Sequence, residues 1–344
     1  MKAAIVEIPG KLVVREIPKP AIGGYDVLCQ LLYGATCTGT DQHLIHGRFP
    51  WPPKYPTILG HESIGRVVEA GPKVRHFKAG ALVTRVGCPA LPGAGLDSHW
   101  GGFAEFGVAR DHFAAKEDGR PENEWSGHRI NQLVPADFDP AAATMIITWR
   151  ETLSFITRMG VGPGARLLVL GSGGNGLAFV SHGVNLGAAC VAMTGSARRE
   201  ESARGAGAQA YYDYARADLH EAIKKEHPQG FDFIIDAVGR KGLLDSSLRH
   251  CSSGGRVAIY GIDDFGQCAL NPSHARGTFT FFNGGYDEAE THERVLGFIR
   301  AGKLRAKHWL DLEHPLPLER IAEAYREPGK RKFAKAVVDL AASR

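Results

Sequence analysis

The chain has 344 residues, 44% of them hydrophobic and 23% charged, which is enough for two globular domains of ordinary size. Its formal net charge of +4 is too small to indicate a nucleic-acid partner and fits a local anionic ligand better. Nowhere do about eighteen apolar residues run together, so we expect no membrane span.

The N-terminal segment has the character of strands rather than of a secretion signal. In MKAAIVEIPGKLVVREIP, Glu7 and Glu16 interrupt the apolar runs, whereas a signal peptide needs an unbroken apolar stretch. The cysteines are scattered and form no Cys-x-x-Cys pair, which is typical of reduced thiols. We therefore expect a cytoplasmic protein.

Up to about residue 148 the sequence predicts an all-β, partly barrel-like domain. Pro- and Gly-rich turns separate short apolar or alternating runs that we expect to be strands: KAAIVE, KLVVREI, DVLCQLLY and SIGRVVEAG.

From Arg166 onward, apolar strands alternate with helices. RLLVLG precedes a helix from about Gly174, and ACVAM precedes a helix through Arg204. Three more buried strands are expected at DFIID, RVAIYG and TFTFFNGG, followed by a helix near Glu319 to Arg326 and a last strand, FAKAVVDL. This alternation predicts a parallel sheet covered on both faces, and hence an α/β protein with a doubly wound domain.

Four possible metal ligands come from three separated segments. Cys37 lies in GATCTGTDQHLIHG, His61 and Glu62 lie in YPTILGHESIG, and Glu151 lies in WRETLSF. Thiolate, imidazole and carboxylate are ligands that Zn²⁺ prefers, and a catalytic zinc keeps one position open. Singly, Cys37 could be a small buried hydrophobe, His61 a hydrogen-bonded turn residue and Glu151 a first-turn acid of a helix. Their joint occurrence ahead of a nucleotide-binding loop favours the metal site.

That loop is RLLVLGSGGNGLAF, which has G-x-G-x-x-G spacing directly after an apolar strand. Gly171 would make the tight turn, Gly173 would let the backbone approach a pyrophosphate, and Gly176 would allow close packing of helix on strand. Gly174 and Asn175 lie inside the loop. The alternative is an empty structural turn, but the strand-to-helix context favours dinucleotide binding.

The residues at the end of the next strand predict which nicotinamide coenzyme is preferred. Thr194 stands where such folds usually present a carboxylate to the ribose, and Ser196, Arg198 and Arg199 follow it. Without a carboxylate, the hydroxyl and arginines would favour a 2′-phosphate and therefore NADP(H) over NAD(H). Alternatively, the two arginines simply open a solvated helix. Further cofactor contacts are expected at the ends of two later strands, at Gly261 and Asn283.

The segments GHES, EAGPKVRHFKAGALV, GSGGNG and MKAAIVE…REIPKP together resemble the medium-chain zinc-dependent dehydrogenases, in particular the polyol (sorbitol), threonine and sugar dehydrogenase branch. The resemblance covers almost the whole chain. It implies a GroES-like catalytic domain formed by residues 1–148 with 286–344, and a Rossmann domain formed by residues 149–285 that binds the nicotinamide cofactor.

The resemblance also implies roles for individual residues. Cys37, His61 and Glu151 match the zinc ligands of the polyol branch, and Glu62 matches the residue that sits behind the metal or exchanges with its water. Thr40 and His43 match the relay that moves the alcohol proton to solvent, although His43 could also be a plain surface residue.

The loop that holds Cys37 departs from the family pattern. The usual Cys-x-Thr-Asp is here Cys37-Thr38-Gly39-Thr40-Asp41, which is one residue longer. Either the loop absorbs the extra residue as a bulge and Cys37 binds the metal, or Thr38 occupies the ligand position, as in a Ser-Thr-Gly-Thr-Glu string of some zinc-free relatives. The presence of the other ligands favours Cys37.

The structural zinc lobe of the family is a second departure. That lobe needs four closely spaced cysteines, and residues 86–106 offer only Cys88. We therefore expect one catalytic zinc per chain and no structural zinc.

The predicted activity is hydride transfer between NADP(H) and secondary hydroxyls of polyols, sugars or cyclitols. Two alternatives stay open: a zinc-free quinone or enone reductase of the same superfamily, and a non-catalytic nucleotide-binding redox sensor. We expect a homodimer or homotetramer with a small-molecule substrate and neither nucleic acid nor membrane as partner. Candidate residues for lining the substrate entrance are Phe49, Trp51, His99 and Trp100.

Overall fold

The computed structural model describes residues 1–326 and 332–341, which form two compact units. Unit 1 contains Met1–Ile147 and, of the described tail, residues 310–326 and 335–341. Unit 2 contains Thr148–Trp309 and Lys332–Ala334.

Unit 1 is the mostly-β part of the chain. Its strands are β1 (Lys2–Ile8), β2 (Lys11–Glu16), β3 (Asp26–Ala35), β4 (Thr57–Ile58), β5 (Glu62–Ala70), β6 (Leu82–Thr84), β7 (Asp97–Ser98), β8 (Phe106–Arg110), β9 (Gln132–Val134), β16 (Leu316–Pro317) and β17 (Val337–Asp339). One sheet has the order β2-β1-β4-β7, and the other has the order β16-β17-β3-β5-β6-β9 with β8 also paired to β3. The helices of this unit are α1 (Thr38–Ile45), α2 (His112–Glu117), α3 (Pro140–Ala143) and α10 (Glu323–Arg326). The four early strands predicted from the sequence are all present.

The register of three strands in unit 1 brings distant segments together. β3 and β5 pair antiparallel with Ala35 opposite Glu62, and β17 pairs antiparallel with β3 with Val337 opposite Ala35. The residues that follow β3, those at the start of β5 and those that precede β17 therefore meet at one end of this sheet. These are the segments at residues 36–41, 60–62 and 335–336.

Unit 2 is a six-stranded parallel sheet with the order β12-β11-β10-β13-β14-β15. The strands are β10 (Arg166–Leu170), β11 (Cys190–Gly195), β12 (Ala210–Asp213), β13 (Phe231–Asp236), β14 (Cys251–Ile259) and β15 (Phe279–Phe282). The helices are α4 (Met145–Met159), which begins in unit 1, α5 (Gly174–Asn185), α6 (Glu200–Gly205), α7 (Leu219–Glu226), α8 (Leu243–Ser247) and α9 (His292–Arg300). This strand order is that of the doubly wound dinucleotide-binding fold, so the predicted α/β fold class is confirmed.

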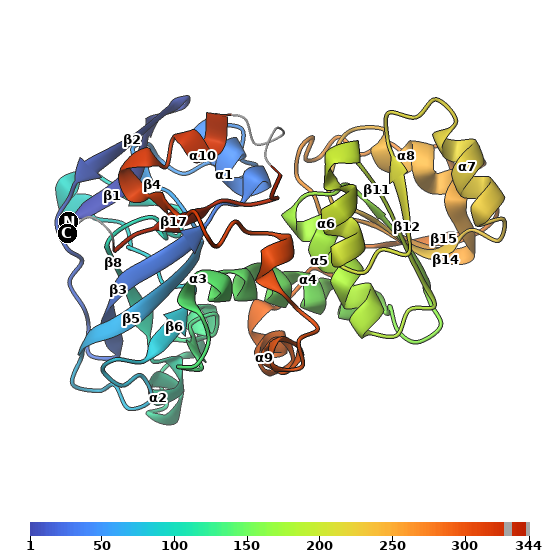
Figure 1. Ribbon diagram of the computed structural model, residues 1–344. Helices are drawn as coiled ribbons and strands as arrows, with labels where there is room; N and C mark the ends of the chain where they lie inside the picture. The colour runs from blue at the N-terminus through green and yellow to red at the C-terminus, as the bar shows by residue number, and fades with distance from the viewer. Residues whose placement is uncertain (327–331, 342–344) are drawn as a thin grey trace. The chain divides into compact units, whose positions relative to one another are not determined.

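Successive side chains of the buried strands pack on opposite faces of this sheet. Leu168 and Leu170 share a buried cluster with Ile223 of α7 and Leu244 of α8. Leu167 points to the other face, where Gly183 of α5 packs so closely that a Cβ would press on it. Helices α5 and α6 accordingly lie on one side of the sheet, and α7 and α8 on the other (Figure 1). Strand β12 was not predicted, because AYYD is too short to give a periodic signal.

Residues 286–309 lie in unit 2, whereas the sequence analysis assigned them to the first domain. Two ion pairs attach this segment to α4: Arg150 binds Glu288, and Arg158 Nε lies 2.8 Å from Glu290 Oε1. Arg150 and Glu288 are both buried. The sequence analysis predicted neither helix α9 of this segment nor its packing against α4.

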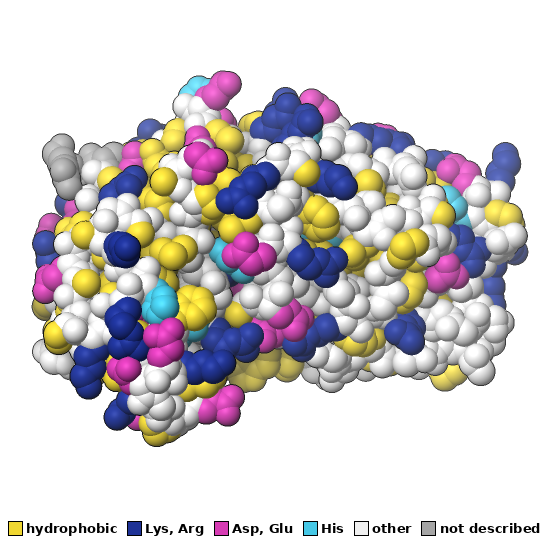
Figure 2. Space-filling view, turned by 90° about the horizontal axis from the view of Figure 1, so that it is seen from below, with side chains coloured by type: hydrophobic (Ala, Val, Ile, Leu, Met, Phe, Trp, Pro, Cys, Tyr) yellow, Lys and Arg dark blue, Asp and Glu magenta, His cyan; other side chains and the backbone are white. Residues whose placement is uncertain are grey.

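The chain has 41 Lys and Arg residues and 37 Asp and Glu residues, so positive and negative charges are nearly balanced. On the face seen in Figure 2, basic and acidic side chains are interspersed with hydrophobic and polar ones. Within the described residues, no helix is both long enough and apolar enough to cross a bilayer.

Candidate metal centre and nucleotide loop

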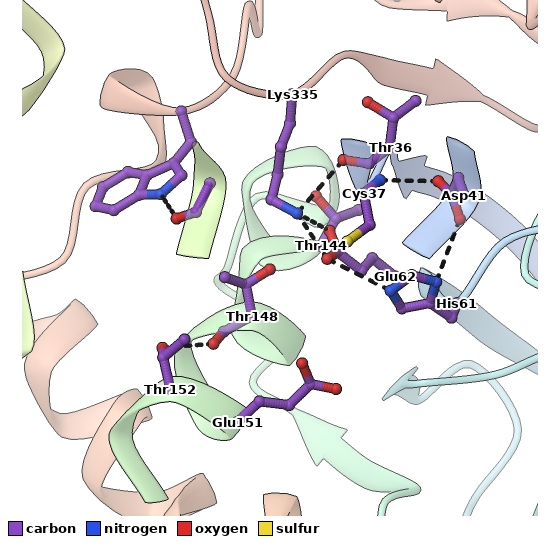
Figure 3. Close-up of polar contacts among 12 residues, drawn as sticks. Thr36, Cys37, Asp41, His61, Glu62, Thr144, Thr148, Glu151, Thr152 and Lys335 are labelled. Carbon is purple, nitrogen blue, oxygen red and sulfur yellow. Dashed lines mark hydrogen bonds and ion pairs between the residues drawn. The ribbon is translucent and has the colours of Figure 1, made fainter. Parts of the chain in front are cut away.

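Three of the four predicted metal ligands meet in unit 1. The ligand atoms of Cys37, His61 and Glu62 all lie within 4.8 Å of one another, and all three side chains are buried (Figure 3). Cys37 immediately precedes α1, and His61 and Glu62 stand at the start of β5. A thiol, an imidazole and a carboxylate held this close form a donor set that suits zinc.

The glycine before His61 has a conformational reason. Gly60 has a φ of +96°, and a Cβ at this position would overlap the ring and backbone of Phe103. Glycine adopts such a backbone without strain. The Gly-His-Glu string therefore combines a turn that needs glycine with the two side chains that this turn directs into the site.

Asp41 connects the parts of this centre and is fully buried. Its Oδ2 accepts hydrogen bonds from the backbone N–H of Cys37 at 2.8 Å and from the hydroxyl of Tyr325 at 2.6 Å. Its Oδ1 lies 3.4 Å from Nδ1 of His61. A carboxylate behind a ligand histidine fixes the orientation and tautomer of the ring. The sequence analysis quoted Asp41 only as part of the loop, although an acid in the first turn of α1 is itself a signal.

Lys335 is the residue that sequence reasoning missed. Its Nζ donates to both carboxylate oxygens of Glu62, at 2.6 and 2.7 Å, and approaches the carbonyl oxygen of Thr36 at 3.4 Å (Figure 3). Both members of the ion pair are about 2% exposed. Burial opposes the charge on Lys335, but Glu62 outweighs it and raises the lysine pKa. No local pattern marks this lysine, because only the pairing of β17 with β3 brings it to the site.

The ring of His61 favours the charged form when no metal is bound. Burial lowers its pKa, but hydrogen bonds with Asp41 and Cys37 outweigh burial and raise the pKa to about 10. A ligand histidine must be neutral at the coordinating nitrogen, so a metal ion would compete with a proton for this ring.

The other predicted residues of the loop lie on α1. His43 is buried, and its Nδ1 donates to the carbonyl oxygen of Gly39 at 2.7 Å, which orients the ring. Thr38 and Thr40 are half-buried in the first turn of the helix. The relay role of Thr40 and His43 stays a prediction.

Glu151, the fourth predicted ligand, belongs to unit 2, where it lies on α4. It is 8% exposed, and its Oε2 accepts a hydrogen bond from the hydroxyl of Tyr260 at 3.2 Å. Its part in metal binding stays a prediction.

In unit 2, the glycine loop connects β10 to α5 as the sequence predicted. Gly171 has a φ of +100°, and a Cβ on Gly176 would overlap the carbonyl of Gly171, so both positions need glycine. Gly173 precedes the helix without a side-chain cap, and a Cβ there would meet nothing within 4 Å. The open space in front of uncapped backbone N–H groups is a cradle for a phosphate.

The residues at the end of β11 and directly after it differ in burial. Thr194 is 6% exposed, and its carbonyl accepts a hydrogen bond from Gly171 N–H at 2.9 Å. Ser196 is half-buried, and its N–H donates to the hydroxyl of Ser172 at 3.3 Å. Arg198 is exposed, whereas Arg199 is buried and donates to the carbonyl oxygen of Lys332. The two arginines are therefore not equivalent.

The remaining predicted cofactor residues differ in their contacts and in their exposure to solvent. The carbonyl oxygen of Gly174 accepts a hydrogen bond from the indole of Trp309 at 2.8 Å, and Asn175 is half-buried in the first turn of α5. A Cβ on Gly261 would overlap the backbone of Val238. Asn283 is exposed, just after the edge strand β15.

Comparisons with known proteins agree with both halves of this description. Residues 23–118 match the alcohol dehydrogenase GroES-like domain, and residues 174–288 match the zinc-binding dehydrogenase family. An L-threonine 3-dehydrogenase of Streptomyces coelicolor is 30% identical, with 76% of this chain and 77% of that protein covered. The chain therefore belongs to the zinc-dependent medium-chain dehydrogenase family and is an NAD(P)-dependent oxidoreductase that acts on alcohols.

Within that family the chain is similar to polyol dehydrogenases. D-arabinitol dehydrogenase 1 of Uromyces fabae is 24% identical over 98% of this chain and 97% of its own length. Among solved structures, a protein from Sinorhizobium meliloti assigned as a zinc-binding dehydrogenase and bound to NADP has a TM-score of 0.79 at 23% identity, with 98% of each chain covered. At that identity the likeness establishes the fold.

Proposed function

We propose that this protein interconverts secondary alcohols and ketones of the polyol, sugar or cyclitol type, with one catalytic zinc and a preference for NADP(H). The buried cluster of Cys37, His61 and Glu62 carries the proposal, because it places a thiol and an imidazole, both zinc-type donors, and a carboxylate within 4.8 Å of one another. Cys37, His61 and Glu151 are the proposed protein ligands. Bound zinc supplies a Lewis acid that lowers the pKa of an alcohol hydroxyl.

Glu62 is proposed to act behind the metal rather than as a permanent ligand. Both of its carboxylate oxygens accept hydrogen bonds from Lys335, so direct ligation would need to break part of a buried ion pair. The same contact holds the Glu62 carboxylate beside His61, whose Nε2 lies 3.7 Å from Glu62 Oε1.

The proton leaves by residues of α1 in this proposal. Thr40 takes the hydroxyl proton, and His43, oriented by the Gly39 carbonyl, passes it to solvent. Asp41 holds the backbone of Cys37 and the ring of His61 throughout. Overall, the alcohol loses one proton and one hydride, a ketone forms, and one coenzyme molecule is reduced.

The coenzyme preference is assigned to Thr194, Ser196 and Arg198. Thr194 places no negative charge near the ribose, and the exposed Arg198 provides a cation for the 2′-phosphate. Arg199, which already donates to Lys332, is assigned a supporting role.

The test is a spectrophotometric assay of zinc-loaded protein with a panel of alcohols and both coenzymes. We expect NADP reduction with secondary polyols or cyclitols at a higher kcat/KM than with ethanol or with NAD. Activity retained after complete removal of zinc, together with reduction of quinones or enones, would instead identify a zinc-free reductase. No turnover of any compound would identify a nucleotide-binding sensor.

A further inference from the structure

Two residues beside the metal cluster have an unusual backbone. Arg85 has a φ of 63° and Trp100 a φ of 67°, and within residues 1–326 and 332–341 they are the non-glycine residues with positive φ. Such conformations are disfavoured for residues with a side chain and are found often at ligand sites, where the surroundings hold them.

The two residues hold one another and the metal-ligand candidate His61. The guanidinium carbon of Arg85 lies 5.3 Å from the centre of the Trp100 ring, which is a cation–π distance. Arg85 Nη1 donates to the carbonyl oxygen of His61 at 2.6 Å, and the Trp100 ring lies 5.2 Å from the His61 ring. Each of the two disfavoured backbones thus fixes a side chain against His61.

Trp100 keeps an open surface despite these contacts. It is 39% exposed, and two further aromatic side chains support its edges: the His99 ring lies 4.2 Å from it and the Phe49 ring 6.1 Å. A large indole fixed in place but left uncovered is a ready surface for a flat ligand.

A pocket next to this indole indicates the size of such a ligand. His61, Arg85 and Trp100 line a pocket of about 300 Å³ together with Arg110 and Asn131. This volume is at the lower end for small-molecule sites and suits one substituted ring. Its polar walls are already ordered, since Asn131 donates to the Arg85 carbonyl at 2.9 Å and Arg110 pairs with Asp26 at 2.7 Å.

We propose that Trp100, held by Arg85, determines specificity by stacking on the substrate, and that the substrate is a single polyhydroxylated ring rather than an open-chain polyol. This inference rests on the proposed function. A cyclitol or sugar ring presents a flat face of C–H groups to an indole and hydroxyls to polar walls. An open-chain polyol covers less of the indole and loses more rotational freedom on binding.

The test compares myo-inositol with D-sorbitol, which have the same numbers of carbons and hydroxyls but differ in ring closure. Using the zinc-loaded protein with coenzyme, kcat/KM and calorimetric affinity are measured for the native chain and for Trp100→Leu, Trp100→Phe and Phe113→Leu. Phe113 is a matched control, because it is also 39% exposed but lies on α2.

We expect the native protein to bind and oxidise inositol better than sorbitol by about threefold to tenfold, the size of one favourable contact with an aromatic ring. Trp100→Leu should remove that preference mainly through KM, Trp100→Phe should keep part of it, and Phe113→Leu should leave it unchanged. Equal or better binding of sorbitol by the native protein, or an equal loss for both compounds in Trp100→Leu, overturns the ring proposal. Failure of every alcohol in the assay contradicts the proposed function instead, and the calorimetric comparison still decides between ring and chain.

Discussion

The nucleotide loop of unit 2 and the metal cluster of unit 1 are built from the chain in different ways. The loop is one continuous segment, in which Gly171, Gly173 and Gly176 each meet a local requirement of a strand-to-helix turn. The cluster is assembled by the pairing of β3 with β5 and β17, and its members lie up to about 300 residues apart in sequence, as Thr36 and Ala336 do. A local site can be read from a motif, whereas an assembled site depends on partners that no motif contains.

The largest expected effect comes from removing the thiol of the assembled site. Cys37→Ser should lower kcat/KM by more than the roughly 10–100-fold loss that is typical of removing a partner behind a metal ligand. The serine hydroxyl is a poor zinc ligand at neutral pH. Steady-state kinetics measures the loss, with Cys268→Ser as control, because Cys268 is exposed. If Thr38→Ala abolishes activity and Cys37→Ser does not, the extra loop residue shifts the ligand position to Thr38.

The second prediction tests whether Lys335, which is distant in sequence, stabilises the cluster. Lys335→Met leaves the Glu62 carboxylate buried without its cation, which should cost about 3–5 kcal/mol of folding free energy. Thermal unfolding should show a clearly lower midpoint, and adding Glu62→Gln should restore part of it. Lys332→Met is the matched control, since its side chain is 67% exposed and pairs with Glu201 at 3.8 Å. Equal midpoints for the two lysine variants would mean that the buried pair contributes nothing.

A smaller effect is expected at the nucleotide site of unit 2, where the substitutions should change the preference between NADP and NAD but not the fold. Arg198→Ala should raise the KM for NADP by about one to two decades, the equivalent of one arginine–phosphate contact, with little change for NAD. Thr194→Asp should shift the preference toward NAD. Arg204→Ala serves as control, because Arg204 on α6 binds the Gln209 carbonyl at 2.6 Å. Turnover with NAD that equals or exceeds turnover with NADP in the native protein would contradict the assignment.

The last prediction concerns the acid stability of unit 2, where the expected effect is the smallest per unit of pH. His182 is fully buried, its Nε2 donates to the Trp149 carbonyl at 3.0 Å, and burial, with a smaller contribution from Arg294, lowers its pKa to about 3. Between that value and the ordinary value near 6.5, the unfolded chain binds more protons than the folded chain. Stability should therefore fall as pH drops below about 6.5, by at most about 1.4 kcal/mol per pH unit from this group.

The check is the pH dependence of the thermal midpoint in the native chain, in His182→Gln and in His314→Gln. His182→Gln should flatten the dependence, whereas the exposed His314 should not affect it. An unchanged slope in His182→Gln would show that other groups govern acid unfolding.

The sequence predicted the fold class, five of the six strands of unit 2 and the four longest strands of unit 1, because each is an apolar or alternating run bounded by turns. It did not predict several short strands of unit 1, such as β4 and β7. It missed β12, whose four residues carry no periodicity, and it assigned residues 286–309 by position in the chain rather than by the ion pairs to α4. At the sites, the glycine loop and the Gly-His-Glu string were predictable from the sequence, because the backbone at these turns requires glycine. Lys335 was not, because its pairing with Glu62 follows from strand register over 273 residues.

The central claim is that the assembled cluster in unit 1 holds one zinc ion through Cys37. Elemental analysis of zinc-replete, dialysed protein tests it most directly, with Cys37→Ser measured alongside. The account predicts one zinc per chain in the native protein and none in the variant. Two zinc ions per chain, none, or an unchanged zinc content in Cys37→Ser would contradict it.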